Sequence, residues 1–353
     1  MLGALAITIP RLFVHTGTLS LFLSIASLAL VLIAVTIIFQ EFFSYNEFID
    51  KLFPVATAEN IVATFKPAVE RRATIVVCAH HDSAREFRLI YKFKGLYVLF
   101  VLVAFLVLFL MLIVTSLNMA GDILLLFGMI AHDSWLFATS NAVLATILAL
   151  TPVAAFMFVF TGDDVVPGGR DDLAGCVTVL GTARFIAKHR PRFVEVKVAT
   201  LDSEEAGLRG SKRFIAMHRE ELAGNGFILN SDSIGNHGIV TVVSHESTTR
   251  TKHDAKWVEF IANASRRIGI QGIDVVVKGD PFGGGGTDAV SFTRAGIPAT
   301  TIHMYMPLRY HLEKYHTRYD DASFVEPCAI QDAVDIAIAV IRDLDDRCSD
   351  EKE

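Results

Sequence analysis

The sequence predicts an α/β protein with a mostly parallel mixed sheet sandwiched by helices, an N-terminal transmembrane helix and an inserted transmembrane hairpin. Apolar strand-like runs alternate with helical patterns, and this alternation is typical of a parallel sheet that is covered on both faces. Three long apolar stretches without a charged residue, in a chain that is 52% hydrophobic, indicate the membrane helices.

The strand-like runs lie at 74–79, 194–201, 226–231, 238–244 and 297–304, and the helical patterns lie at 172–188, 209–223, 253–268, 286–295 and 326–345. These elements predict one soluble domain, which the sequence divides into residues 43–94 and 163–348. The charged tail 349–353 is expected to fray. A net charge of −6 gives no sign of nucleic-acid binding.

Each uncharged stretch is long enough to cross a hydrocarbon core of about 30 Å. The first, 19–39, belongs to the N-terminal segment 1–42. The other two, 95–116 and 141–162, predict a hairpin that occupies the insertion 95–162. A buried core helix is the alternative for each stretch, and a cleaved signal sequence is a second alternative for the first.

Glu204 and Glu205 lie just after the strand-like run 194–201. Two adjacent carboxylates at the end of a strand can divide two tasks, because one can ligate a metal while the other takes a proton from water. Paired glutamates are also common on solvated helix surfaces. The pair therefore predicts a metal site only together with other candidate ligands.

Four further segments supply candidate ligands, and imidazole and carboxylate groups suit zinc. His80, His81 and Asp82 end one strand-like run, Asp171 and Asp172 start a helical pattern, Asp232 ends another strand-like run, and His316 lies in a Tyr-His-Thr sequence. In open α/β sheets, ligands bind beyond the carboxyl ends of the strands, which is where several of these residues are expected.

Other interpretations of these residues are open. Asp171 and Asp172 can cap the helix that follows them. Asp232 can form an Asx turn before Gly235. His303 and His311 lie near His316 in the sequence and compete with it as a ligand.

Together these segments resemble the zinc-dependent aminopeptidases of peptidase family M28. The landmarks of that family are His-x-Asp, Asp-Asp-x-x-Gly, Glu-Glu-x-Gly-x-x-Gly-Ser, an Asp after a strand and a late Tyr-His-Thr, and all five occur here in this order. The resemblance covers roughly residues 70–90 and 162–345. It implies a zinc-aminopeptidase-like fold, a peptide substrate and two zinc ions.

The resemblance also implies a role for each residue. Asp171 would bridge the two zinc ions, His80 and Asp232 would complete one site, and Glu205 and His316 would complete the other. Glu204 would be the general base, and Asp82 would orient His80, as a carboxylate behind a ligating histidine commonly does.

One motif departs from the family pattern. The family often has Ser-Asp-His near the substrate pocket, whereas this chain has Thr287-Asp288-Ala289 after a glycine run that begins at Gly283. The glycine run lacks the Gly-Lys-Ser/Thr of a phosphate-binding loop. The departure puts the substrate contacts in doubt but not the metal ligands. Asp288 can bind a substrate amine or start a helix.

The long insertion between His80 and Asp171 restricts the topology. Two ligands of one metal lie on the same side of a membrane, so the insertion crosses an even number of times, with 117–140 as the far loop. Six basic residues lie between residues 71 and 94, whereas the far loop has no Lys or Arg. Positive charge favours the cytoplasmic side, which predicts a multi-pass protein with a cytoplasmic catalytic domain.

The sequence therefore predicts a membrane-anchored binuclear zinc metallopeptidase, most simply an aminopeptidase, with a peptide substrate and the lipid bilayer as its partners. The alternatives are a carboxypeptidase or a glutaminyl-cyclase-like enzyme of the same fold, and an inactive receptor or scaffold. A transporter is a further alternative, but it would need charged or polar groups inside the spans. The oligomeric state is left open.

Overall fold

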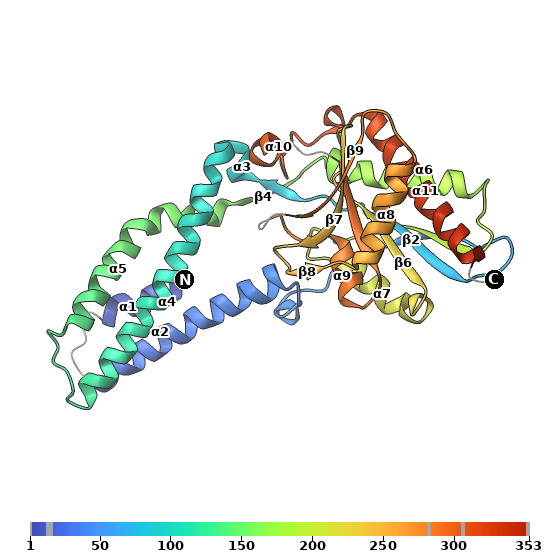
Figure 1. The fold of residues 1–353 in the computed structure, drawn as a ribbon. Helices are drawn as coiled ribbons and strands as arrows, with labels where there is room; N and C mark the ends of the chain where they lie inside the picture. Colours follow the sequence, from blue (N-terminus) through green and yellow to red (C-terminus); the bar gives the residue numbers. More distant parts are fainter. Residues whose placement is uncertain (1, 12–16, 281–283, 305–307, 351–353) are drawn as a thin grey trace. The chain divides into compact units, whose positions relative to one another are not determined.

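The computed structural model describes residues 2–11, 17–280, 284–304 and 308–350. It divides the chain into two compact units, which Figure 1 shows in the colours of the sequence. The helical unit comprises Met1–Phe42, Phe48–Asp50 and Phe87–Gly162. The α/β unit comprises Phe43–Glu47, Lys51–Glu86 and Asp163–Glu353.

The α/β unit is built on a mixed sheet with the order β1-β5-β2-β6-β10-β7-β8, and β9 also pairs with β7. The strands are β1 (Ile61–Phe65), β2 (Ala73–His80), β5 (Val194–Leu201), β6 (Gly226–Ser231), β7 (Ile239–Glu246), β8 (Thr251–Lys252), β9 (Asp274–Asp280) and β10 (Ala299–Met304). The central four strands, β5-β2-β6-β10, are parallel, which confirms the predicted fold class.

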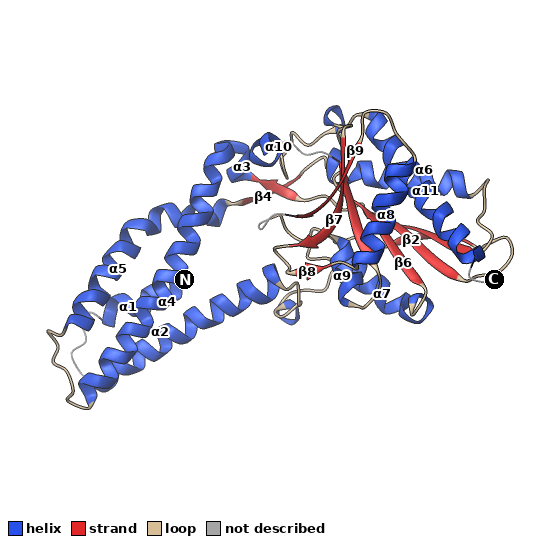
Figure 2. Ribbon diagram, in the orientation of Figure 1, coloured by secondary structure: helices blue, strands red, loops and turns tan. Residues whose placement is uncertain are grey.

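Helices cover both faces of this sheet (Figure 2). Ile75 and Val77 of β2 belong to a core with α6 (Ala174–Ile186), α8 (Ala255–Arg267) and α11 (Pro327–Asp350). Val76 and Cys78 of the same strand face α7 (Arg209–Leu222) and α9 (Asp288–Arg294). All eight residues of β2 are buried, which explains why its sequence is a continuous apolar run.

Several short elements were not predicted. They are β1, β8 and β9 in the sheet, the small helix α10 (Leu308–Glu313), and the two-stranded pair of β3 (Arg85–Phe87) and β4 (Thr161–Val165). β1 and β9 are partly exposed, and their apolar runs, 61–63 and 275–277, are shorter than that of β2. The predicted fraying of the tail falls partly on residues 351–353, which lie outside the described residues, and α11 extends to Asp350.

The helical unit consists of α1 (Leu2–Arg11), α2 (Gly17–Ile38), α3 (Arg88–Phe93), α4 (Tyr97–Leu126) and α5 (Trp135–Ala154). With their extensions, the three helical segments Gly17–Phe43, Arg88–Leu126 and Trp135–Val159 are long and apolar enough to cross a membrane. The loop between α4 and α5 is shorter than the expected 117–140, because the apolar sequence after 117 continues α4 as far as Leu126.

The longer α4 places a carboxylate inside the helical unit. Asp122 is only 1% exposed and accepts hydrogen bonds from Ser20 (2.8 Å) and Ser24 (2.6 Å) of α2. The predicted far loop 117–140 includes Asp122, outside the uncharged span. Asp122 instead joins α2 to α4, and hydroxyl donors satisfy both of its oxygens, as a buried carboxylate requires.

Candidate metal centre

Strand β2 ends at the centre of the site. His80 is the last residue of β2, pairs in register with Leu201 of β5 and is 2% exposed. Its Nε2 atom lies 3.1 Å from Oδ1 of Asp171. Because β5 and β2 end at the same level of the sheet, the loop with Glu204 and Glu205 begins beside His80.

Asp171 faces two imidazoles at once. Its Oδ1 atom lies next to His80, and its Oδ2 atom lies 3.2 Å from Nε2 of His316. The same Nε2 atom of His316 is 3.1 Å from Oε1 of Glu205. Asp171 lies in the short helical segment Gly169–Leu173 that precedes α6, and its own backbone is not helical. The Asp171 carboxylate therefore lies between two groups of candidate ligands, one with His80 and the other with His316 and Glu205.

The described residues contain three groups of side chains whose candidate ligand atoms all lie within 4.8 Å of one another. The groups are His80, Asp171 and Asp232; Asp171, Glu205 and His316; and His80, Glu204 and Glu205. The first two groups share Asp171 and contain all five predicted ligands. Zinc binds imidazole and carboxylate ligands at about 2.0–2.2 Å, so ligand atoms a few ångströms apart fit one ion between them.

The charges of these side chains also favour the binding of a cation between them. Burial, together with the carboxylate of Asp171, raises the pKa of Asp232 to about 6. Burial raises the pKa of Glu204 well above its usual range, and the carboxylate of Glu205 raises it further. Burial opposes protonation of His316, but the carboxylates of Glu205 and Asp171 raise its pKa to about 10. Divalent metal ions would compensate this excess of negative charge, so the donor set fits zinc.

Asp82 holds the paired glutamates in place. One of its carboxylate oxygens accepts the N–H of Glu204 (3.0 Å), and the other accepts the N–H of Glu205 (3.1 Å). Nδ1 of His80 lies 3.5 Å from the Asp82 carboxylate and 3.1 Å from its backbone oxygen. Asp82 therefore contacts the Nδ1 side of His80 and also supports the Glu204–Glu205 turn, a contact that was not predicted.

Asp320 is a supporting residue that no sequence motif predicts. Its carboxylate accepts the backbone N–H groups of Arg170 and Asp171, both at 3.2 Å, and it is 1% exposed. On the same segment, the ring of Tyr315 stacks on His316 at a centroid distance of 3.9 Å. The only signal in the sequence was the position of Asp320 four residues after His316, which is not specific.

The alternatives for individual ligands have clear positions in the structure. His303 contacts Asp280 (3.0 Å) and the backbone oxygen of Asp232 (2.9 Å), and it belongs to none of the three ligand groups. Asp172 accepts the N–H of His80 at 3.3 Å, and helix α6 has no side-chain cap. His81 and His311 also lie outside the ligand groups among the described residues. His316 is therefore the histidine of this region that faces Asp171.

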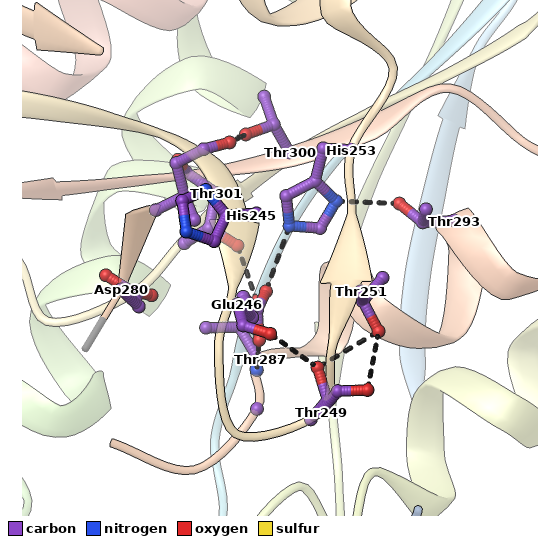
Figure 3. A network of polar contacts seen from close by, with 12 residues as sticks. His245, Glu246, Thr249, Thr251, His253, Asp280, Thr287, Thr293, Thr300 and Thr301 are labelled. Carbon is purple, nitrogen blue, oxygen red and sulfur yellow. Dashed lines mark hydrogen bonds and ion pairs between the residues drawn. The ribbon is translucent and has the colours of Figure 1, made fainter. Parts of the chain in front are cut away.

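A buried polar network supports the glycine loop (Figure 3). Glu246 accepts the N–H and the hydroxyl of Thr287, both at 2.8 Å, and is 3.1 Å from Nε2 of His253. Nδ1 of His253 lies 2.7 Å from the hydroxyl of Thr293. Asp288, at the start of α9, is fully buried. Gly283 of the predicted motif lies outside the described residues.

Candidate metal ligands of the histidine and carboxylate type therefore gather at the carboxyl end of a mainly parallel sheet, where α/β proteins commonly bind their ligands. The chain belongs to peptidase family M28, whose family model matches residues 153–341. The match begins at residue 153, near the end of the insertion 95–162, so it does not contain His80 and Asp82. The structure brings these two residues to the matched part through β2, which pairs with β5 and β6.

Solved structures of similar fold include two bacterial aminopeptidases and a cyclase. An aminopeptidase from Aneurinibacillus sp. strain AM-1 is 18% identical, with a TM-score of 0.47 over 80% of this chain and 47% of that chain. The zinc aminopeptidase BSAP from Bacillus subtilis is 17% identical, with a TM-score of 0.48 over 80% and 49%. A glutaminyl cyclase from an Acidobacteriales bacterium is 13% identical, with a TM-score of 0.44 over 82% and 74%.

The chain spans about half the length of the two aminopeptidases. No curated protein matches the chain in sequence.

Proposed function

We propose that this protein is a zinc-dependent aminopeptidase that binds two zinc ions and uses Glu204 as its general base. The observation that carries the proposal is the position of Asp171 between His80 and His316, with Glu205 beside His316 and Glu204 next in the chain. In this proposal His80, Asp171 and Asp232 hold one ion, and Asp171, Glu205 and His316 hold the other.

Zinc at such a site lowers the pKa of water and polarises a carbonyl group. The residues of the chain perform the proton transfers. Burial and the neighbouring carboxylate of Glu205 raise the pKa of Glu204, which makes its carboxylate a stronger base. Glu204 takes a proton from the attacking water and later gives it to the leaving amine. Asp82 holds the Glu204 backbone and thereby fixes the direction of this transfer.

The excess of carboxylates favours an aminopeptidase over a carboxypeptidase. A free α-amine is cationic and suits an acidic site, whereas a terminal carboxylate needs a cation to bind it. Arg170 is the arginine next to Asp171, but it is buried, and it donates to Asn236 (2.7 Å) and to the backbone oxygen of Met304 (3.1 Å). Because Asp288 is fully buried, we assign recognition of the amine to the carboxylates at the metal centre instead.

The direct test measures zinc content and peptide hydrolysis on the detergent-purified protein. We expect two zinc ions per chain and release of leucine from a leucyl peptide, with no release from the same peptide after N-acetylation. Chelation should abolish the activity, and added zinc should restore it. Metal without hydrolysis of any free-amine peptide would favour a cyclase or another hydrolase of this fold. Absence of bound metal would favour the inactive receptor or scaffold.

We also propose that the three apolar helical segments cross a membrane and that the α/β unit is cytoplasmic. His80 precedes the inserted helices and Asp171 follows them, and their side chains meet at 3.1 Å. The insertion therefore returns to the side from which it started, and two crossings by α4 and α5 satisfy this condition. The basic residues that precede α4 favour the cytoplasm as that side.

A single exposed thiol can test this orientation. Cys328 is exposed, whereas Cys78, Cys176 and Cys348 are buried. We expect a membrane-impermeant maleimide to label Cys328 only after the cells are permeabilised. In a Cys328→Ser background, Asp133→Cys in the α4–α5 loop should be labelled in intact cells. The reverse pattern would place the α/β unit outside the cell, and labelling of both sites on one side would exclude a spanning hairpin.

A further inference from the structure

The ring of Tyr45 lies against Gly207, two residues after the candidate ligand Glu205, although Tyr45 comes from the segment that follows α2. This segment, Phe43–Glu47, belongs to the α/β unit. The hydroxyl oxygen of Tyr45 accepts the N–H of Gly286 at 3.1 Å. A Cβ atom added to Gly207 would lie 3.4 Å from the Tyr45 ring, and one added to Gly286 would lie at the same distance. The ring therefore fills the space between the loop after Glu205 and the glycine loop.

The position of Tyr45 is fixed by contacts on both sides of it. Glu47 forms ion pairs with Arg213 (2.7 Å) and Lys212 (3.3 Å) of α7. Lys212 also donates to the backbone oxygen of Tyr45, and Arg294 of α9 donates to the backbone oxygen of Ser44 at 2.5 Å. Charged groups from two helices thus hold a five-residue segment against the α/β unit.

The glycine loop cannot supply a side chain at this place. A Cβ atom on Gly286 would lie 2.5 Å from the Thr249 side chain, which is closer than atoms can approach. Behind the loop, Glu246 accepts two hydrogen bonds from Thr287, so Gly286 has little freedom to move away (Figure 3). The aromatic ring and the hydroxyl on this side of the site therefore come from Tyr45.

The Tyr45 hydroxyl is available as a donor. Its oxygen receives the Gly286 proton, and no acceptor for its own proton occurs in the part of the chain that the structure describes. Burial raises the pKa of Tyr45, and the nearby Glu204 carboxylate raises it further, so the phenol stays protonated at neutral pH. The side chain is nevertheless only half-buried, which leaves part of it open to a bound molecule.

We propose that Tyr45 is a substrate-contacting residue, whose hydroxyl donates a hydrogen bond to the scissile carbonyl oxygen beside Glu204 and whose ring packs against the first substrate residue. This inference rests on the proposed peptidase function. In this proposal the segment Phe43–Glu47, which follows α2, contributes a residue to the active site and does more than connect two parts of the chain.

Two substitutions separate the hydroxyl from the ring. Tyr45→Phe should lower kcat on a leucyl peptide by roughly 10²-fold, because a donor aimed at developing negative charge acts mainly in the transition state. Its KM, zinc content and melting temperature should stay close to those of the wild type. Tyr45→Ala should show the same loss of kcat and also a several-fold higher KM, because it removes the ring.

Glu47→Gln is the matched control, because it weakens the contact of the same segment with α7 without changing Tyr45. We expect its kcat to stay within about 3-fold of the wild type, since ion pairs that are partly open to solvent contribute little and the hydrogen bond from Lys212 to the Tyr45 backbone remains. An unchanged kcat in Tyr45→Phe would overturn the inference, and so would a loss that parallels a loss of zinc or of melting temperature. Failure of the wild type to hydrolyse any peptide would instead overturn the proposed function.

Discussion

Glu204→Gln is expected to reduce kcat on a leucyl peptide by about 10²- to 10⁴-fold, the range that general acid–base catalysis usually supplies. The amide is close in shape to the carboxylate but cannot accept the proton of water. The Glu204 backbone N–H would still bind Asp82, so the turn and the other ligands should keep their positions. Activity assays and metal analysis on the same preparation measure the two effects together, and zinc content should equal that of the wild type.

Glu205→Gln provides the matched comparison, because the neighbouring side chain has the same length and a similar burial. Its Oε1 atom is 3.1 Å from His316, so we expect this variant to lose zinc together with activity. One other assignment of Glu204 competes with its role as a base. His80, Glu204 and Glu205 also form a compact group of candidate ligands, in which Glu204 would bind the metal. Loss of zinc from Glu204→Gln would support that assignment and would contradict the role of Glu204 as a base.

The sequence predicts the central elements well because their signals are local. Strand β2 is buried on both faces, so its continuous apolar run is visible without any knowledge of its neighbours. The ligand motifs are short, and all but the one with His316 lie close to the end of a strand or the start of a helix; His316 lies in a turn after α10. β1 was missed because its apolar run, 61–63, is too short to mark a strand by itself. Its place in the sheet follows only from its pairing with β5.

The supporting residues of the site could not be predicted for a related reason. Asp320 acts on the backbone of Asp171, and Tyr45 acts beside the glycine loop, yet neither residue has a characteristic spacing from its partner. A hydrogen bond between segments so far apart in the sequence depends on the folded sheet. Asp122 illustrates the same limit, since its role depends on the serines of α2.

Asp171→Asn is expected to have the largest effect on metal binding. Asp171 is the residue that the two principal ligand groups share, with one carboxylate oxygen toward His80 and the other toward His316. An asparagine side chain has one carbonyl oxygen and one NH₂ group, and the NH₂ group is no zinc ligand. We therefore expect the variant to hold at most one zinc ion and to lose kcat by more than about 10³-fold, because a two-metal site clamps both reacting oxygens.

Asp172→Asn tests whether this effect belongs to the ligand or to the acidic pair. Asp172 is equally buried and directly adjacent, but its contact is the backbone N–H of His80 at 3.3 Å, which an amide oxygen can also accept. Its zinc content should therefore be close to that of the wild type. Chelation should lower the melting temperature of the wild type and of Asp172→Asn, since a metal that binds only the folded state stabilises it. The shift should be much smaller in Asp171→Asn, and equal shifts in all three proteins would exclude Asp171 as the bridging ligand.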